Sequence, residues 1–518
     1  MNRLLDNKFF VIFFAPFLLG SITILGFPPF NFFLINFFSF SVLLFLISIV
    51  SKKTYSKFRK KKFKRYFFYV GCAFGFGFFL SGNYWIVISL THDEAFKSLI
   101  PFALILIPLF LSIFFGLAIL ISGQLINKRI SFILLFSLIF SIFEYLRGTL
   151  LTGFPWNLIS YSWIWSIESI QILSYVGTYS LSLIAITFFC SPFLFFQTKI
   201  IKKNIIFFLF LLLLFIFNYL FGYIKINNSF YKSDQNIHIK IVSPSFSMSD
   251  YNKNSELLNL NSLIKFSDPK KLQKTIFIWP EGVFSETSLY EIEKYKDLFK
   301  NNFSKNHLIV LGINNFLDEK YYNSLTVLNN KLDIISVYNK VNLVPFGEFL
   351  PLEKHLLKFG FKKITRGYNS FSPGDKRLLI NLNSQFAGKK ILPLICYEII
   401  YTGKIKTKSQ QPDLAINISE DAWFGKSIGP YQHFSKSVFR SIEEGIFIAR
   451  SANKGISAFI NPNGKVIKSL NAGESGNIVL NFPYFSGTTL FSNYGNKIFY
   501  LLIFLYMFLI LILRKYKI

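Results

Sequence analysis

Residues 391–398 read Ile-Leu-Pro-Leu-Ile-Cys-Tyr-Glu, a short apolar run that ends on a thiol, a phenol and a carboxylate. Similar runs, short and rich in β-branched residues, recur between residues 235 and 490, and several are separated by helical or loop segments. This pattern is typical of buried strands in an α/β sandwich. We therefore predict an α/β sandwich domain over residues 235–490. The predicted strands are 238–242, 275–279, 308–313, 334–337, 391–395 and 414–418.

The rest of the chain has a different composition. The 518 residues are 52% hydrophobic and include 67 Phe, which is more apolar surface than a soluble domain needs. Runs of about twenty apolar residues are long enough to cross a bilayer as helices. We predict an α-helical membrane bundle, with a membrane domain at 1–228 that holds seven transmembrane helices and an eighth helix at 496–513. The eight predicted spans are 8–26, 31–50, 67–90, 98–122, 131–147, 170–196, 205–223 and 496–513.

The connections between these apolar runs alternate in charge. Basic connections lie at 51–65, 128–129, 199–203 and 514–517, and the other connections carry fewer cations. Basic connections usually face the cytoplasm, whereas long domains cross the membrane largely regardless of their charge. We therefore expect both termini in the cytoplasm and the 235–490 domain on the outer face. The first apolar run lacks a small-residue cleavage site, so we interpret it as a retained helix and not as a signal peptide.

The net charge of +29 does not indicate a nucleic-acid partner. Its densest cluster has nine Lys or Arg between Lys52 and Arg65 and lies between two apolar runs, where cations meet anionic headgroups. No recognisable nucleic-acid module accompanies the charge, so we expect membrane lipids and no nucleic acid as partners. Cys396 is the only cysteine of the 235–490 domain, which excludes a disulfide within it. The His and Cys residues show no metal-ligand spacing, and we expect no metal.

Three reactive side chains follow predicted strands of the domain: Glu281 in Trp-Pro-Glu-Gly, Lys340 in Tyr-Asn-Lys, and Cys396. Each alone has an ordinary interpretation, as a surface Glu beside a turn, a solvated Lys or a buried structural Cys. Acyl transfer through a thioester needs a thiolate, a base, and a cation or donors for the oxyanion. Sites in open α/β sheets lie at the carboxyl ends of strands. Together the three residues therefore predict an active site on one rim of the sheet.

Longer motifs around these residues resemble those of the apolipoprotein N-acyltransferases, a branch of the nitrilase or carbon–nitrogen hydrolase superfamily. The resemblance extends over essentially the whole chain and includes the eight predicted spans. It implies a nitrilase-like sandwich for the 235–490 domain. The motifs that carry it are Thr152–Trp156, Tyr338–Lys340, Leu343–Glu348, Cys396–Glu398, Asp421–Ser427 and Gly429–Phe434.

The resemblance also implies roles for individual residues. Cys396 would be the nucleophile, Glu281 the general base and acid, and Lys340 the stabiliser of the oxyanion. Glu348 would orient Lys340 or share a proton in the site. Two neighbours of the nucleophile, Tyr397 and Glu398, would shape the pocket. Contacts to substrate are assigned to Trp156, Trp423 and His433.

The reaction implied is a transfer between two lipids. The family takes an acyl chain from a phospholipid, typically phosphatidylethanolamine, onto the cysteine as a thioester. It then passes the chain to the α-amino group of the diacylglyceryl-cysteine at the start of an apolipoprotein, which completes lipoprotein maturation. The resemblance implies no cofactor. It implies a multi-pass protein of the bacterial inner membrane, with the catalytic domain on the periplasmic side.

Two departures from the family pattern concern substrate binding. Glu420 stands where the family usually has Asn before Asp-Ala-Trp-Phe-Gly. The segment from Val242 to Tyr251 contains no Trp, and either Phe246 or Tyr251 can replace the expected aromatic.

Two other functions compete with acyl transfer to lipoproteins. The first is a membrane-anchored amidase that hydrolyses a small amide with the same three residues. Eight spans argue against it, because tethering needs only one. The second is a transporter or lipid-binding scaffold with an inactive enzyme domain. It would predict a broken triad, whereas Glu281, Lys340 and Cys396 are all present.

Overall fold

The fold is taken from a computed structural model. It describes residues 2–56, 61–127, 129–196, 202–251, 255–284, 286–356, 358, 370–405, 411–484 and 487–516. Parts of the predicted basic connections, namely residues 57–60, 128, 199–201 and 517, lie outside the described residues. The chain forms two compact units. The first comprises Met1–Val87, Asp93–Asn228 and Asn493–Ile518, and the second comprises Ile88–His92 and Ser229–Ser492.

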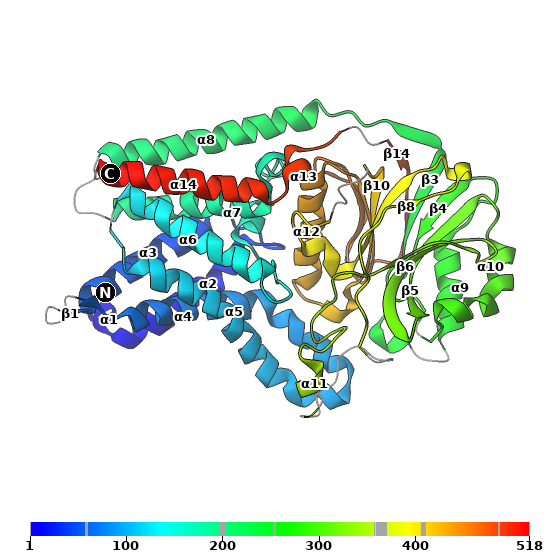
Figure 1. The fold of residues 1–518 in the computed structure, drawn as a ribbon, viewed down its shortest axis with the longest axis horizontal. Coiled ribbons are helices and arrows are strands. Elements are labelled where there is room, and N and C mark those ends of the chain that lie inside the picture. The colour runs from blue at the N-terminus through cyan, green and yellow to red at the C-terminus, as the bar shows by residue number, and fades with distance from the viewer. Residues whose placement is uncertain are drawn as a thin grey trace. The chain divides into compact units, whose positions relative to one another are not determined.

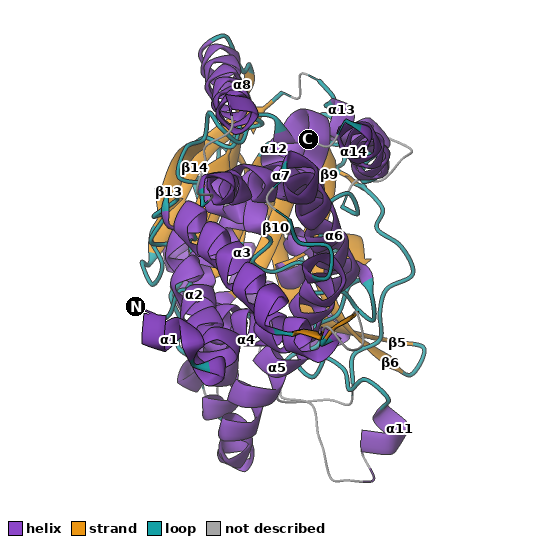
Figure 2. Cartoon of the chain, turned by 90° about the vertical axis from the view of Figure 1, so that its left-hand side faces the viewer, coloured by secondary structure: helices purple, strands orange, loops and turns teal. Residues whose placement is uncertain are grey.

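The first unit is helical (Figures 1 and 2). Within the described residues, seven helical segments are long and apolar enough to cross a membrane, and a shorter apolar helix covers Phe10–Gly26. A backbone in lipid must satisfy its own hydrogen bonds, and an α-helix does so within one segment. The prediction of a membrane helical bundle is confirmed. Its main helices are α2 (Ala15–Thr23), α3 (Ile35–Lys53), α4 (Lys64–Asn83), α5 (Ile100–Gly123), α6 (Ile130–Thr149), α7 (Leu173–Cys190), α8 (Lys202–Asn227) and α14 (Lys497–Lys515).

Small residues allow close packing between neighbouring helices of this unit. A Cβ added to Gly77 of α4 would lie 2.1 Å from the carbonyl oxygen of Phe17 in α2. A Cβ on Gly71 would lie 2.5 Å from the carbonyl oxygen of Phe115 in α5. Small residues at membrane helix interfaces let backbones approach closely, and packing replaces the hydrophobic drive that lipid cannot supply. The close packing of α4 against α2 and α5 therefore depends on these two glycines.

Two buried charged residues of α6 hold the segment that follows it. Glu144 accepts a hydrogen bond from the Ile159 N–H at 3.0 Å. Arg147 donates through Nη1 to the carbonyl oxygens of Phe154, at 2.6 Å, and Trp156, at 2.8 Å. Buried non-helical backbone in this unit therefore finds its partners in side chains of the adjacent helix.

The second unit contains two six-stranded sheets. Each sheet has three parallel strands at its centre and antiparallel strands beside them. Five of the six predicted strands lie within observed strands, and the other, 275–279, extends one residue past the end of β4. The first sheet is ordered β14 (Gly476–Pro483), β3 (Ser233–Ser243), β4 (Lys274–Ile278), β5 (His307–Leu317), β6 (Lys320–Asn329) and β7 (Ile334–Asn339). The second is ordered β13 (Val466–Leu470), β12 (Ser457–Ile460), β11 (Ile448–Asn453), β10 (Leu414–Glu420), β9 (Lys390–Ile395) and β8 (Ile380–Asn381).

The two sheets pack face to face around one apolar core. Ile276 and Val310 of the first sheet belong to the same buried cluster as Ile395 and Ile416 of the second. The other face of the first sheet is covered by α9 (Glu256–Ser267) and α10 (Lys296–Asn302). On the second sheet, α12 (Gly429–Glu444) packs against β11 and β12. The predicted α/β sandwich is confirmed, and its layers bring the ends of the central strands of both sheets together.

Candidate active site

Three strand ends carry the predicted reactive residues. Glu281 follows β4 by three positions, between Pro280 and Gly282, whose φ of 65° suits glycine. Lys340 follows β7 directly, and Cys396 follows β9 directly. The first sheet thus supplies Glu281 and Lys340, and the second sheet supplies Cys396.

Cys396 has a strained backbone. Its φ is 48°, in the left-handed region that residues with a side chain rarely occupy. Such conformations persist only where the surrounding structure holds them, and they cluster at active sites. The residue before it is held by Glu398, whose Oε2 accepts the Ile395 N–H at 2.9 Å. The geometry at the end of β9 therefore sets the direction of the thiol.

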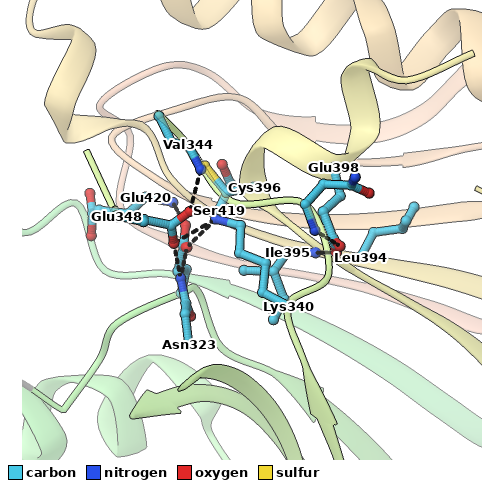
Figure 3. A network of polar contacts seen from close by, with 12 residues as sticks. Asn323, Lys340, Val344, Glu348, Leu394, Ile395, Cys396, Glu398, Ser419 and Glu420 are labelled. Carbon is cyan, nitrogen blue, oxygen red and sulfur yellow. Dashed lines mark hydrogen bonds and ion pairs between the residues drawn. The ribbon is translucent and has the colours of Figure 1, made fainter. Parts of the chain in front are cut away.

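Lys340 is bound between two carboxylates. Its Nζ lies 3.3 Å from Oε1 of Glu281 and 2.9 Å from Oε1 of Glu348. Asn323 of β6 donates through Nδ2 to the same two oxygens, at 2.7 Å each. Figure 3 shows Asn323, Lys340 and Glu348 pointing toward one another, close to Cys396. One cation and one amide thus hold two buried carboxylates side by side.

The charges around Lys340 set its protonation. Burial lowers the pKa of Lys340, but Glu281 and Glu348 outweigh it, and the pKa is raised well above its ordinary value. Lys340 is therefore an ammonium group at neutral pH. A buried ammonium of this kind can stabilise an oxyanion that forms beside it.

At the Cys396 thiol, the effects that favour the neutral form outweigh those that favour the charged form. Burial raises its pKa well above the ordinary value, the Glu281 charge raises it further, and Lys340 lowers it. The resting residue is therefore a thiol and needs a base when it attacks. Glu281 acts electrostatically on both Cys396 and Lys340.

Glu348 and Glu398 position the other groups of the site. Glu348 Oε2 accepts the Val344 N–H at 2.8 Å, while its Oε1 contacts Lys340. Glu398 is fully buried, and its Oε1 accepts the N–H groups of Val341, at 3.0 Å, and Asn342, at 3.2 Å. Glu398 therefore joins the loop that follows Lys340 to the end of β9.

Two further donors hold Glu398. Tyr338 donates through its hydroxyl at 2.7 Å, and Arg377 through Nη2 at 2.7 Å. The Arg377–Glu398 ion pair is nearly excluded from solvent. Tyr397, beside the nucleophile, is buried with its ring 5.5 Å from the Tyr401 ring. A buried ion pair is costly to break, so this pair anchors the nucleophile turn.

The three predicted substrate contacts lie in different surroundings. His433 of α12 is buried, with Nε2 3.3 Å from the carbonyl oxygen of Cys396 and Nδ1 2.9 Å from Oδ1 of Asp421. Trp423 is half-buried and its ring lies 5.6 Å from that of His92. Trp156 belongs to the helical unit, where it is buried. The structure thus brings His433 to the backbone of Cys396.

Asp421 joins His433 to Arg450, which donates through Nη2 to Oδ2 at 2.8 Å. Burial would raise the pKa of Asp421, but Arg450 and His433 hold it well below its ordinary value. Burial and the Arg450 charge lower the pKa of His433. Asp421 is therefore a charged carboxylate at neutral pH, and it holds His433 against the Cys396 carbonyl.

Several residues of the site were not predicted from the sequence. Asn323 lies in a strand that was not predicted, and its contact with Lys340 depends on the pairing of β6 with β7, in which the Lys340 N–H donates to the Asn323 carbonyl at 2.8 Å. Arg377 is at least 21 positions away in sequence from every residue with which it forms a side-chain hydrogen bond. The one signal that could have indicated Asn323 is the pairing of β6 with the strand that ends just before Lys340, which places a polar residue of β6 beside that strand end. Among the described residues, no group of three or more His, Cys, Asp or Glu side chains could hold a metal ion.

Comparison with known sequences adds an independent finding. The profile of the apolipoprotein N-acyltransferase N-terminal domain matches residues 19–191, and that of carbon–nitrogen hydrolase matches residues 279–482. The apolipoprotein N-acyltransferase of Rickettsia typhi is 34% identical over 488 residues, which are 93% of this chain and 94% of that protein. The same enzyme of Rhizobium etli is 30% identical over 498 residues, which are 92% and 91% of the two chains.

A solved structure is also similar to part of this chain. It is the crystal structure of a CN-hydrolase superfamily protein from Xanthomonas campestris. The match has 16% identity and a TM-score of 0.35, and it covers 48% of this chain and 91% of that one.

Proposed function

This chain belongs to the apolipoprotein N-acyltransferase family and is an acyltransferase of bacterial membranes, and on that premise we propose that it works through a thioester on Cys396. The acyl donor is a phospholipid, with phosphatidylethanolamine as the first candidate. The acceptor is the α-amino group of an N-terminal diacylglyceryl-cysteine. The enzyme lies in the inner membrane, with the catalytic unit on the periplasmic side.

The first half-reaction forms the thioester. Glu281 takes the proton from Sγ of Cys396, and the thiolate attacks the ester carbonyl carbon of the phospholipid. Lys340 stabilises the oxyanion that develops. When the tetrahedral intermediate collapses, the bond from carbon to the glycerol oxygen breaks, and Glu281 returns its proton to that oxygen. The lysophospholipid then leaves.

The second half-reaction transfers the acyl chain. The amino group of the lipoprotein attacks the thioester carbonyl and gives a proton to Glu281. The carbon–sulfur bond breaks, and Cys396 leaves as a thiolate that recovers the proton. An amide forms on the acceptor, and the enzyme returns to its starting state. Both substrates are bulky lipids, so a covalent intermediate lets one leave before the other enters.

The observation that carries this proposal is the meeting of Glu281, Lys340 and Cys396 at strand ends of the two sheets. Lys340 bonds Glu281 directly, and both act electrostatically on the strained Cys396. A base, a cation and a thiol in one buried place are the three groups that thioester chemistry needs.

The test is to incubate the purified protein with phospholipid alone and measure its intact mass. We expect an acyl adduct on Cys396 that hydroxylamine removes, and no adduct in Glu281→Gln. Initial-rate plots with both substrates should run parallel. Intersecting plots without an adduct at any time would contradict the thioester. Release of free fatty acid with no transfer to the lipoprotein would instead indicate a hydrolase.

A further inference from the structure

Another buried carboxyl group, besides those of Glu281 and Glu348, lies at this site and takes no part in the mechanism above. It belongs to Glu420, the last residue of β10. The Glu420 N–H donates to Oε2 of Glu281 at 2.9 Å. The other oxygen of Glu281 is the one that contacts Asn323 and Lys340. The Glu420 N–H therefore binds Oε2 of Glu281, and Lys340 binds Oε1.

The Glu420 side chain fixes the backbone that makes this contact. Its Oε1 accepts the Ala422 N–H at 3.0 Å, which closes the turn after β10. Its Oε2 accepts the Tyr251 hydroxyl at 2.6 Å. Asn453 at the end of β11 donates through Nδ2 to both oxygens, at 2.8 and 3.0 Å. Three separate segments thus converge on one carboxyl.

Asn453 is itself held in place. Its Oδ1 accepts the Phe246 N–H at 2.7 Å, and its Nδ2 donates to the Phe246 carbonyl at 2.9 Å. Phe246 and Tyr251 lie in the segment that follows β3, in the first sheet, whereas Glu420 and Asn453 end strands of the second. The carboxyl of Glu420 therefore ties the two sheets together next to the base.

We propose that Glu420 is a positioning residue, which uses its carboxyl to lock the turn after β10 so that the Glu420 N–H holds Glu281 in the orientation from which it serves Cys396. The proposal rests on the function proposed above, in which Glu281 is the base. Glu420 acts through Glu281 and does not touch the reacting atoms.

The ionisation of the Glu420 carboxyl gives a way to test this role. Among the described residues, the hydrogen-bond partners of the Glu420 carboxyl are all uncharged. Burial raises its pKa to about 8, even though bonds from Tyr251, Asn453 and Ala422 lower it, and the Glu281 charge raises it further. The titratable or charged groups around it are Glu281, Tyr251 with the nearby Asp250, and Asp421 next in sequence. Glu420 is therefore a neutral acid at pH 7 and gains a charge beside Glu281 above pH 8.

The first variants separate hydrogen bonding from charge. Glu420→Gln keeps the shape of the neutral acid, and its amide oxygen can still accept the Ala422 N–H that closes the turn, so we expect acyl-enzyme formation at pH 7 within about threefold of the wild type. Glu420→Ala frees the turn, and we expect a loss of about tenfold or more in kcat with little change in KM, because a displaced base costs rate and not binding. Tyr251→Phe removes one donor and should fall between them. Glu293→Gln, on the exposed surface, is the matched control and should equal the wild type.

The pH profile tests the charge. The wild-type rate should show an ionisation near pH 8 that is missing from Glu420→Gln. If Glu420 had only a structural role, Glu420→Ala would have a lower melting temperature, and the pH profile of Glu420→Gln would be the same as that of the wild type. That result, or a Glu420→Ala variant with wild-type kcat, would overturn the proposal.

Alkylation of Cys396 by iodoacetamide provides a readout that needs no lipid substrate. Cys396→Ala supplies the background from Cys72 and Cys190. The alkylation rate should fall in Glu281→Gln and Glu420→Ala and be retained in Glu420→Gln. If alkylation follows this order but no variant, including the wild type, transfers an acyl chain, the proposed function fails and the role of Glu420 stands. If the wild type transfers acyl chains and Glu420→Ala matches it in both assays, the role of Glu420 fails alone.

Discussion

The strand ends of the two sheets of the catalytic unit handle buried charge differently. At the ends of the first sheet, Glu281 and Glu348 share one cation, Lys340, so their charges are largely compensated. At the end of β10 in the second sheet, two neighbouring carboxyl groups have different partners, and their pKa values shift in opposite directions. Asp421 pairs with Arg450 and its pKa is lowered, whereas Glu420 meets uncharged donors and its pKa is raised to about 8.

This difference shows that a buried carboxyl takes its role from its partner and not from its type. Desolvation disfavours the charged form of both Glu420 and Asp421, and the Arg450 charge beside Asp421 reverses that effect there. In the proposed mechanism, the first sheet therefore supplies the groups for proton transfer and oxyanion binding. The second supplies the thiol, a charged support behind it, and a neutral acid beside the base.

The largest expected effect comes from removing the thiol of the second sheet. Cys396→Ser should abolish turnover, by about a thousandfold or more, because a hydroxyl is far less acidic than a thiol and Glu281 cannot activate it. Expression and membrane insertion should stay near normal. Purified variant assayed for lipoprotein N-acylation provides the measurement, and substantial activity would exclude Cys396 as the nucleophile.

The next effect concerns the cation of the first sheet. Lys340→Arg should be nearly as damaging as Lys340→Ala, with each losing about a hundredfold or more in kcat. The guanidinium is larger and planar, and it cannot take the place of a compact ammonium between Glu281 and Glu348. Steady-state kinetics of both variants decide the point. Recovery of much of the rate by Arg would mean that Lys340 acts only as a general positive charge.

A stability measurement tests how much the Asp421–Arg450 pair of the second sheet contributes to the free energy of unfolding. Asp421→Asn leaves Arg450 buried without its carboxylate, and we expect a loss of about 3–5 kcal/mol in the free energy of unfolding of the catalytic unit. Asp268→Asn, at an exposed ion pair with Lys270, is the control and should cost at most about 1 kcal/mol. Thermal unfolding of the purified chain in detergent compares them. Equal melting temperatures for the two variants would contradict the support assigned to Asp421.

The smallest effect is the pH dependence that separates Glu420 from Asp421. Because the folded-state pKa of Glu420 is raised, its neutral form stabilises the fold below about pH 4.5, and this stability is lost as the pH rises through about 8. The loss is at most about 1.4 kcal/mol per pH unit. Asp421 has a lowered pKa, so its contribution is present above its ordinary pKa and is lost only in acid.

Melting temperatures of the wild type and Glu420→Gln at pH 6 and pH 9 test this sign. The wild type should lose stability relative to Glu420→Gln as the pH rises, because Gln cannot ionise. A constant difference between the two proteins would show that Glu420 does not titrate in this range.

Much of the architecture could be predicted from local sequence. The six predicted strands are apolar runs, and five of them are largely buried, because strands buried between two layers have no polar face. The sixth, 334–337, lies in the edge strand β7 and is partly exposed. The strands that were not predicted include β6, β13 and β14, which are polar or partly exposed along much of their length. β14 also pairs with β3, which is distant in sequence, and no local pattern indicates that pairing. The first apolar helix was predicted at 8–26, and its observed bounds of Phe10–Gly26 agree closely with this.

The sequence by itself determined the fold class and the family, and it predicted Glu281, Lys340 and Cys396 as the reactive residues, since these depend on composition and on residues adjacent in the chain. Only the tertiary structure decided which group stands beside which. The Asn323 carbonyl reaches the Lys340 N–H through strand register, Arg377 reaches Glu398 from a separate loop, and Glu420 reaches Glu281 across the two sheets. The physical reason is that the protonation and orientation of a buried group depend on contacts within a few ångströms, and these come from residues far apart in sequence.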